Sequence, residues 1–328
     1  MPMHNVSPVL VGGEALYDLI STNPGAGLGG TKTFEKRAGG SPFNIAVGVR
    51  RLDTPTAFVG KIGDDQFGDA LVQFLKKEQI DVDLIVREPG TKTTLAFVAV
   101  DAAGKVDFRF YRDKAADISL HTGELKVFDP RKFSLYHCGG IVLAEEPTAS
   151  AYSSIVDRFM ELGVPVSLDP TIRRSLIADE ETYLNRIRRL AEKVNVLKLS
   201  DEELSYLTGV SDLSRAVREL RVSAGALVIL TLGSKGAEIY RDSERLVSVP
   251  GFSVKVVETT GCGDSFMAAT LSKLAGKTRK EIAGLSPAQL EPIARFANAA
   301  AAIVATRYGA AEANPTREEV EAFLAQNG

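Results

Sequence analysis

Short apolar runs rich in β-branched residues alternate along the chain with longer runs whose apolar residues recur at helical spacing. The predicted strands are Pro8–Val11, Thr56–Val59, Leu84–Val86, Ser134–His137, Val164–Leu168, Val194–Leu197 and Leu227–Thr231. The predicted helices are Pro42–Leu52, Phe67–Glu78, Ala149–Leu162, Glu180–Ala191, Asp201–Leu207, Ser214–Val222, Ser265–Ala275 and Pro292–Tyr308, and a capping box at Thr316-x-x-Glu319 opens one more. Apolar strands between helices indicate a doubly wound α/β fold, with a mostly parallel sheet covered on both faces.

Two regions interrupt this alternation. Residues 14–40 are rich in glycine, and within residues 90–117 two strand-like runs, Thr94–Asp101 and Lys105–Tyr111, flank the hairpin signal Ala-Ala-Gly. We expect these regions to form a small antiparallel sheet that lies over the functional site as a lid. Surface hairpins without a role are the alternative. The chain shows no linker or repeat, so residues 1–328 are predicted to form a single domain.

Composition narrows the class of protein. A chain of 328 residues, 45% of them hydrophobic, suffices for one large α/β domain. The net charge of −3 gives no sign of a nucleic-acid or membrane surface. No apolar run reaches membrane-spanning length, and the first residues lack the features of a signal peptide. The two cysteines, Cys138 and Cys262, exclude a disulfide scaffold and fit a cytoplasmic location, and the three histidines share no metal-ligand spacing.

The segment Glu258–Phe266 carries the strongest chemical signal. It lies between a β-type run, Val254–Val257, and an apolar helical run, Phe266–Leu274. Within it, two glycines flank Cys262 at the predicted start of the helix. Backbone N–H groups at a helix N-terminus have no intrahelical partner and carry partial positive charge, so they bind phosphate oxygens well.

Asp264 follows this pair of glycines directly. A carboxylate at a helix N-terminus stays ionised and can accept the proton of an attacking hydroxyl. The segment therefore suggests phosphoryl transfer to an alcohol, although such a turn taken alone is also typical of a plain helix cap.

A second helix start, Gly39-Gly40-Ser41-Pro42-Phe43-Asn44, has related features. Ser41 suits the N-cap and Pro42 the first turn, while the glycine pair lets the backbone approach a ligand closely. Asn44, one turn into the helix, offers an amide to a polyol. Two common nucleotide motifs are missing: Leu271 stands where a P-loop at Gly276-Lys277-Thr278 needs its first glycine, and no dinucleotide fingerprint follows the first strand, which disfavours an oxidoreductase.

Together with Gly60-x-x-Gly63-Asp64-Asp65-x-x-Gly68, these two segments resemble the signatures of the ribokinase-like (PfkB) carbohydrate kinases. The resemblance extends from about Val9 to Thr316, with the motifs in the family's order. It implies a ribokinase-like fold with a β-sheet lid, and an ATP-dependent sugar kinase activity. A sugar or nucleotide sensor without catalysis on the same fold is the non-enzymatic alternative.

The resemblance also implies roles for individual residues. It identifies Asp264 as the catalytic base and the backbone of Gly261, Cys262 and Gly263 as the anion hole. Asp18, which we expect at the end of the first strand region, is similar to the family's ligand for sugar hydroxyls. Gly39, Gly40 and Asn44 match its sugar-contacting loop. Thr231, Gly233 and Gly236 resemble the nucleotide-binding strand and turn, and Asn298 resembles a residue of the adenine pocket.

Three positions depart from the family pattern. Ser200-Asp201-Glu202-Glu203 stands where the family has Asn-x-x-Glu, in which Glu203 would position hydrated Mg²⁺. Glu258 replaces the usual Asp beside a monovalent cation held by backbone oxygens, which leaves K⁺ dependence open. Cys262 replaces an alanine; it is either an activated thiol or, as we prefer, a small substitute that contributes its N–H.

Two arginine segments bear on the sugar. Phe110-Tyr111-Arg112-Asp113-x-Ala115-Ala116-Asp117 resembles fructokinase-type members, and Asp169-Pro170-x-x-Arg173 resembles fructokinases and 2-keto-3-deoxygluconate kinases. Arg112 and Arg173 are the predicted substrate ligands, and such a pair could also hold an acid sugar's carboxylate. Fructose is the predicted acceptor, with 2-keto-3-deoxygluconate and ribose as alternatives. We expect a small sugar as partner, no nucleic acid or membrane, and a monomer or a lid-mediated homodimer.

Overall fold

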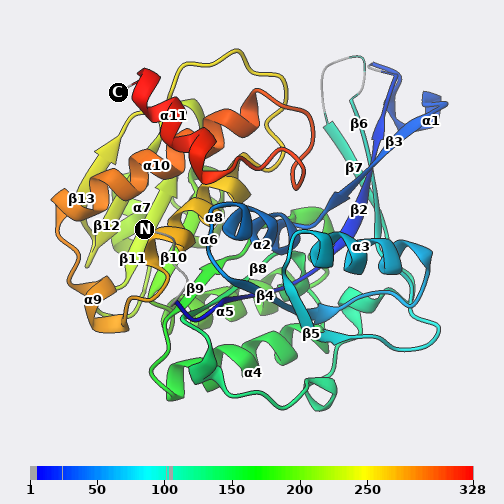
Figure 1. Cartoon of the computed structure of the whole chain (residues 1–328), viewed down its shortest axis with the longest axis horizontal. Coiled ribbons are helices and arrows are strands. Elements are labelled where there is room, and N and C mark those ends of the chain that lie inside the picture. The colour runs from blue at the N-terminus through cyan, green and yellow to red at the C-terminus, as the bar shows by residue number, and fades with distance from the viewer. Residues whose placement is uncertain (1–5, 24, 101, 103–105, 328) are drawn as a thin grey trace.

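A computed structural model describes residues 6–23, 25–100, 102 and 106–327. Its large sheet has nine strands in the order β13-β12-β11-β10-β9-β8-β1-β4-β5 (Figure 1). Their bounds are β1 (Val9–Gly12), β4 (Thr56–Lys61), β5 (Asp81–Val86), β8 (Leu135–Gly139), β9 (Val166–Asp169), β10 (Val196–Ser200), β11 (Leu227–Thr231), β12 (Ala237–Arg241) and β13 (Glu244–Val249). All neighbours pair in parallel except β11–β12 and β12–β13.

Helices cover both faces of this sheet because successive strand residues point to opposite sides. Val9 and Val11 join one core, and Leu10 between them joins the other. The first core includes residues of α2 (Ser41–Arg51), α3 (Gln66–Lys77), α8 (Cys262–Leu274), α10 (Pro287–Ala305) and α11 (Arg317–Asn327). The second includes residues of α4 (Thr148–Glu161), α5 (Glu180–Ala191), α6 (Asp201–Thr208) and α7 (Leu213–Glu219). The predicted doubly wound fold is confirmed.

Three local expectations need correction. Val254–Val257 is not a strand: it pairs with no neighbouring strand, and the N–H of Val257 instead donates to the carbonyl of Ala305 in α10. The helix predicted from Pro292 begins at Pro287, because Ser286 caps it. The β12–β13 hairpin was not among the predicted strands.

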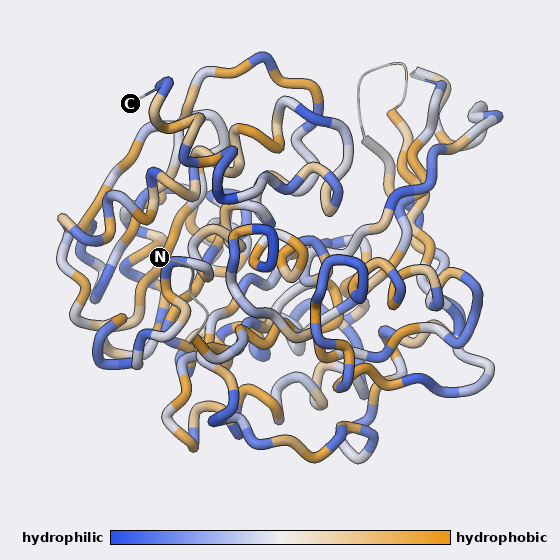
Figure 2. Tube along the Cα trace, in the orientation of Figure 1, coloured by the Kyte–Doolittle hydropathy of each residue, from blue (hydrophilic) through white to orange (hydrophobic). Residues whose placement is uncertain are grey.

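The small sheet consists of β3 (Phe34–Gly39), β2 (Leu16–Ser21), β6 (Leu95–Val100) and β7 (Val106–Tyr111), in that order. β2–β3 and β6–β7 are antiparallel, as expected, whereas β2–β6 is parallel. It projects from one side of the large domain, and Figure 2 shows hydrophobic stretches along it. Most of the predicted turn between β6 and β7, residues 101 and 103–105, and the first five residues lie outside the described part of the chain.

The two faces of the small sheet differ in what they carry. Asp18 of β2 pairs in register with Arg37 of β3 and Ala96 of β6, and Ala96 pairs with Phe110 of β7. Because paired residues share a face, the opposite face carries Phe34, Phe97 and Tyr111.

In the part of the chain that the structure describes, none of the helices has the length and apolar composition that crossing a bilayer requires.

Candidate active site

The first turn of α8 forms an open cradle of backbone donors. Gly261 is the N-cap, in the left-handed conformation with φ 81°, and a Cβ added there would lie 2.8 Å from the Cβ of Ala310. The N–H of Cys262 donates to the carbonyl of Thr259 at 3.2 Å. Within the described residues, the N–H groups of Gly261, Gly263 and Asp264 have no such partner. The cradle therefore presents three N–H groups to an anion, with Cys262 contributing less than predicted.

The carboxylate of Asp264 is fixed by two donors from the start of α2. Ser41 Oγ donates to Oδ1 at 2.7 Å, and Asn44 Nδ2 donates to Oδ2 at 2.8 Å. The two helices approach closely enough for this because Gly48 of α2 faces Ala268 of α8. A Cβ added to Gly48 would lie 2.7 Å from the Cβ of Ala268. Each carboxylate oxygen keeps lone pairs for a further donor, so the group is oriented and still available to a substrate hydroxyl.

Ser41 is a site residue whose importance the sequence did not reveal. It was expected to cap α2, but Gly40 holds the N-cap position with φ 99°, and Ser41 is the first helical residue. Besides Asp264, its hydroxyl contacts the Thr171 hydroxyl at 3.1 Å. The available signal was its spacing from Asn44, since residues three apart lie on one helix face.

Glu14 is a second residue that the sequence analysis did not assign. It follows β1, is 1% exposed, and its Oε1 accepts the backbone N–H of Ser41 at 3.2 Å. Burial raises the pKa of Glu14 to about 7, with the charge of Asp117 adding to the effect. Glu14 thus anchors the N-terminus of α2, whose residues Ser41 and Asn44 hold the carboxylate of Asp264. An acidic residue two positions after a buried strand was the signal that could have identified it.

Asp18 lies within β2 of the small sheet rather than at the end of the first strand region. Burial and the charge of Asp264 together raise its pKa to about 7, against the opposing charge of Arg173. Gly39 leaves room for the carboxylate, since a Cβ there would lie 2.2 Å from Oδ2 of Asp18. The structure thus brings Asp18 and Gly39 together, near Asp264.

The two predicted arginine ligands have different surroundings. Arg112 is 8% exposed, and its guanidinium pairs with Asp117 at 2.9 Å and with Glu145 at 3.4 Å. Arg173 lies 5.9 Å from the ring centroid of Phe108 on the small sheet, and its charge acts on Asp18. Arg173 therefore faces the same space as Asp18, whereas Arg112 is committed to neighbouring acids.

The predicted nucleotide residues gather at the ends of β11 and β13. Thr231 ends β11, and the turn that follows contains Gly233 and Gly236, with φ 58° and 99°. A Cβ on Gly236 would lie 2.0 Å from the carbonyl oxygen of Val249. Asn298 of α10 donates to that carbonyl at 3.2 Å and to that of Pro250 at 3.1 Å. Gly236 and Asn298 thus border the same backbone segment.

Comparison with known proteins decides the family. The model of the pfkB family carbohydrate kinases matches residues 7–317. The chain belongs to this family. It is 38% identical over 317 residues to probable fructokinase-4 of Arabidopsis thaliana, covering 96% of each chain, and 36% identical over 309 residues to fructokinase-1 of Oryza sativa subsp. japonica, covering 94% of each.

Solved structures of fructokinases share the ribokinase-like fold of this kinase. The Xylella fastidiosa fructokinase with bound ATP superposes with a TM-score of 0.89 at 29% identity, covering 98% of this chain and 99% of that one. A Vibrio cholerae fructokinase with bound fructose, ADP and potassium gives a TM-score of 0.83 at 29% identity, covering 97% and 98%.

The kinase's three departures from the family pattern have structural counterparts. Glu203 forms a capping box with Ser200, and its carboxylate accepts the N–H groups of Ile172 and Ser200, both at 2.8 Å. Glu258 pairs with Arg37 of the small sheet at 3.1 Å and accepts the N–H of Gly309. Burial and the charges of Asp264 and Glu258 raise the pKa of Cys262 to about 11, which favours a small residue that contributes its N–H over an activated thiol.

Proposed function

We propose that this kinase is a fructokinase, which transfers the γ-phosphoryl group of ATP to a hydroxyl of fructose. The single observation that carries the proposal is the position of Asp264, held by Ser41 and Asn44 beside the backbone N–H groups of Gly261 and Gly263, which have no backbone acceptor among the described residues. A base and an anion site within one helical turn suit an alcohol attacking a phosphoryl group.

The reaction follows from these contacts. The carboxylate of Asp264 accepts the proton of the attacking hydroxyl, while the N–H groups of Gly261 and Gly263 stabilise the charge on the transferring phosphoryl group. Asp18 and the amide oxygen of Asn44 accept hydroxyls of the sugar. That oxygen is buried and has no partner among the described residues, which suits this role. Most of the rate enhancement comes from positioning and electrostatic stabilisation.

Fructose is favoured over an acid sugar by the state of Arg112. A 2-keto-3-deoxy acid needs a free arginine fork for its carboxylate, but Asp117 and Glu145 occupy the terminal nitrogens of Arg112. Arg173 remains as a ligand for neutral sugar oxygens. The names of the relatives agree with fructose, and ribose is the remaining alternative.

We place the nucleotide across the carboxyl ends of β10 and β11, with its base beside the Val249–Pro250 backbone that Gly236 and Asn298 border. Among the described residues no three metal-ligating side chains cluster, so Mg²⁺ fits here as an ion held by phosphate oxygens and water, with Glu203 acting through water. When bound, Mg²⁺ neutralises phosphate charge.

We place K⁺, if it is used, beside the backbone of Glu258. A comparison of turnover in potassium buffer with turnover in tetramethylammonium buffer tests this.

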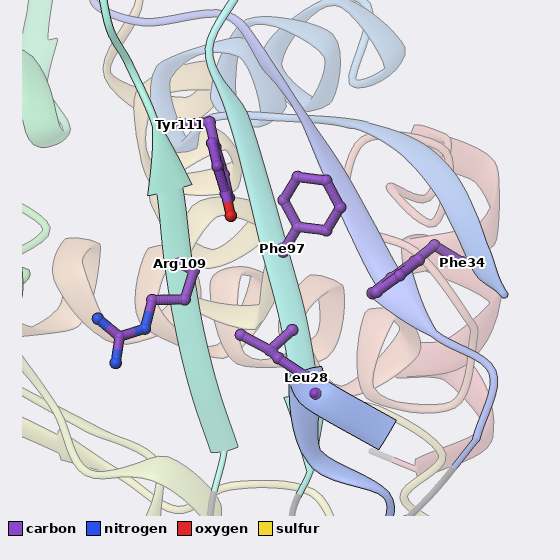
Figure 3. Close-up of a pocket in the computed structure, with 6 residues that line it drawn as sticks. Leu28, Phe34, Phe97, Arg109 and Tyr111 are labelled. Carbon is purple, nitrogen blue, oxygen red and sulfur yellow. The ribbon is translucent and has the colours of Figure 1, made fainter. Parts of the chain in front are cut away.

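The small sheet acts as a lid, and we propose that its outer face joins two copies of the chain. Phe97 lies between Phe34 and Tyr111, with ring centroids 5.1 Å apart in both pairs (Figure 3). With Leu28 and Arg109 these residues line a pocket of about 430 Å³. Tyr111 is 66% exposed. An exposed aromatic surface of this kind is typical of an interface, which favours the homodimer over the monomer.

A coupled ADP-release assay over fructose, ribose, 2-keto-3-deoxygluconate and tagatose tests the proposal. We expect fructose to give the highest kcat/KM. If the keto acid alone responds, Arg112 and Arg173 are its carboxylate ligands and fructose is the wrong substrate. If no sugar releases ADP, the chain is a sensor rather than a kinase.

A further inference from the structure

Lys198 occupies an unusual place for a lysine. It belongs to β10, where its neighbours Val196, Leu197 and Leu199 are fully buried. The side chain of Lys198 is itself only 8% exposed, and its ammonium forms an ion pair with the buried carboxylate of Asp169 at 2.9 Å. Lysine is almost never buried unless it is paired, so both charges require an explanation.

Strand geometry directs Lys198 toward the phosphate cradle. Val196 packs into the core that contains α8, and residues two apart on a strand point to the same side. The ammonium accordingly reaches the first turn of α8, where a Cβ added to Gly263 would lie 3.2 Å from Nζ. Glycine at position 263 therefore keeps the space between the cradle and the ammonium open.

This placement is costly for the fold. The N-terminus of a helix carries partial positive charge, so a cation beside it is unfavourable. A buried ion pair is also weak evidence for stability, because apolar residues of similar volume commonly serve a fold equally well. Burial acts to lower the pKa of Lys198, but the charges of Asp169, Glu203 and Asp264 outweigh it and raise the pKa above its ordinary value. The ammonium and the helix terminus together create a place where a dense negative charge is stabilised.

We propose that Lys198 is a further residue of the phosphoryl-transfer site, whose ammonium stabilises the transferring phosphoryl group from the strand side of the cradle. Asp169 balances the charge of Lys198 before the nucleotide arrives. The proposal rests on ATP as the phosphoryl donor, which ADP release by the wild-type enzyme establishes separately.

A purely positioning role is the competing explanation. The hydroxyl of Thr171, two residues after Asp169, contacts Ser41 at 3.1 Å, and Ser41 holds Asp264. Loss of Lys198 could disturb Asp264 through this chain of contacts. The two roles predict different results for nucleotide binding. Only ATP carries the transferring phosphoryl group, so loss of a direct contact weakens the binding of ATP and not that of ADP. A displaced Asp264 instead lowers turnover without changing the relative affinity for the two nucleotides.

The test compares Lys198→Met with the wild type by calorimetric binding of ATP and ADP in the presence of Mg²⁺, and by kcat. We expect kcat to fall by about 10²–10³, as for loss of one transition-state donor, with ATP affinity lowered about tenfold and ADP affinity almost unchanged. Lys198→Arg should recover part of the ATP preference. Lys193→Met is the matched control, since Lys193 pairs with Asp157 at the surface, and it should change neither quantity.

Removing one partner of a buried pair can unfold a protein, so thermal unfolding of each variant is measured as well. The double variant Lys198→Met with Asp169→Asn removes both charges and serves where Lys198→Met does not fold. The proposal is overturned if a folded variant binds ATP and ADP with affinities that are both unchanged or equally reduced, or if its kcat stays within about threefold of the wild type. A selective loss of ATP affinity together with kcat supports it.

Discussion

The side-chain amide of Asn44 donates to Oδ2 of Asp264 at 2.8 Å, although the two residues are 220 positions apart in the chain. The residue that the sequence analysis assigned to the sugar thus also orients the base. Its amide oxygen remains for a substrate hydroxyl, so one side chain contacts the base and is placed to align the attacking group. The sugar loop and the phosphate cradle therefore form one unit, through the packing of α2 on α8.

Asp264→Asn removes the proton acceptor while preserving the size of the side chain. We expect kcat to fall at least about a hundredfold, because general-base catalysis typically contributes 10²–10⁴. ATP affinity and thermal stability should stay close to those of the wild type. Steady-state ADP release and calorimetry measure both effects, with the surface variant Asp157→Asn as control. Turnover near the wild-type rate would exclude Asp264 as the base.

Ser41→Ala deletes one of the two hydrogen bonds that orient Asp264. A hydrogen bond to a charged group contributes about 1.5–3 kcal/mol, which corresponds to a loss of kcat of about 10- to 100-fold. The KM for the sugar should change less than kcat, because Asn44 and Asp18 remain. Ser41→Thr, which keeps the hydroxyl, should recover part of the loss. A variant with unchanged kcat would mean that Asn44 alone positions the carboxylate.

The elements of the site that could be predicted are those with local signals. That helices start near Gly261 and Gly40 could be predicted, because a few neighbouring residues specify helix capping and the backbone conformations that glycine favours. The exact starts were wrong: α8 begins at Cys262 rather than Ser265, and Gly40 rather than Ser41 is the N-cap of α2. Asp264 was predicted for the same reason, since its position in the first helical turn follows from the sequence around it. The parallel sheet followed from the apolar strands between helices.

What could not be predicted depends on packing between distant segments. Glu14, Ser41 and Lys198 look unremarkable in their own segments, and they belong to the site because β1, α2, β10 and α8 meet at one edge of the sheet. Val254–Val257 shows the reverse case. Its β-branched residues predict a strand, but the strand has no neighbour to pair with, and local propensity alone does not form one.

Glu14 makes the stability of the protein depend on pH. Its folded-state pKa of about 7 is raised above the ordinary value of 4.5, so its contribution to stability is complete at low pH and is lost as the pH rises through 7. The difference corresponds to about 3 kcal/mol at most. Glu14→Gln should therefore reduce the fall in unfolding free energy between about pH 5 and pH 8, measured by urea denaturation.

Asp18→Asn supplies the comparison, because burial also raises the pKa of Asp18 to about 7. Asp18→Asn should independently reduce the fall in unfolding free energy between about pH 5 and pH 8, since Asp18 lies on β2 and Glu14 follows β1. If the unfolding free energy of Glu14→Gln falls with pH as steeply as that of the wild type, Glu14 is ionised in the folded protein at about pH 5. Its burial then does not control the pH dependence of stability between about pH 5 and pH 8.

Cys262 should behave as an inert residue despite its place in the phosphate cradle. Its raised pKa of about 11 leaves almost no thiolate at neutral pH, and the thiolate is the reactive form. Iodoacetamide should therefore modify it slowly, and Cys262→Ala should retain kcat within about twofold, since the backbone N–H is unchanged. Mass spectrometry of the alkylated peptide and ADP release check the two outcomes. Rapid alkylation at neutral pH would contradict the raised pKa.

Gly261→Ala tests whether the shape of the cradle is essential. Two effects oppose a side chain here: the left-handed conformation, at about 1–2 kcal/mol, and the approach of the new Cβ to within 2.8 Å of Ala310. Gly163→Ala separates them, because Gly163 has φ 75° but no atom within 4 Å of an added Cβ. Gly163→Ala should lower the unfolding free energy only by the cost of the left-handed conformation, and it should keep the wild-type kcat.

The variant at position 261 should lose more unfolding free energy than the one at position 163, and its kcat should fall at least about tenfold as the N–H groups move away from the phosphoryl group. Adding Ala310→Gly removes the contacting methyl group. The double variant should therefore recover part of both losses, while the cost of the left-handed conformation remains. Full activity of Gly261→Ala alone would show that the cradle tolerates displacement, and that the phosphoryl group is held chiefly by other groups.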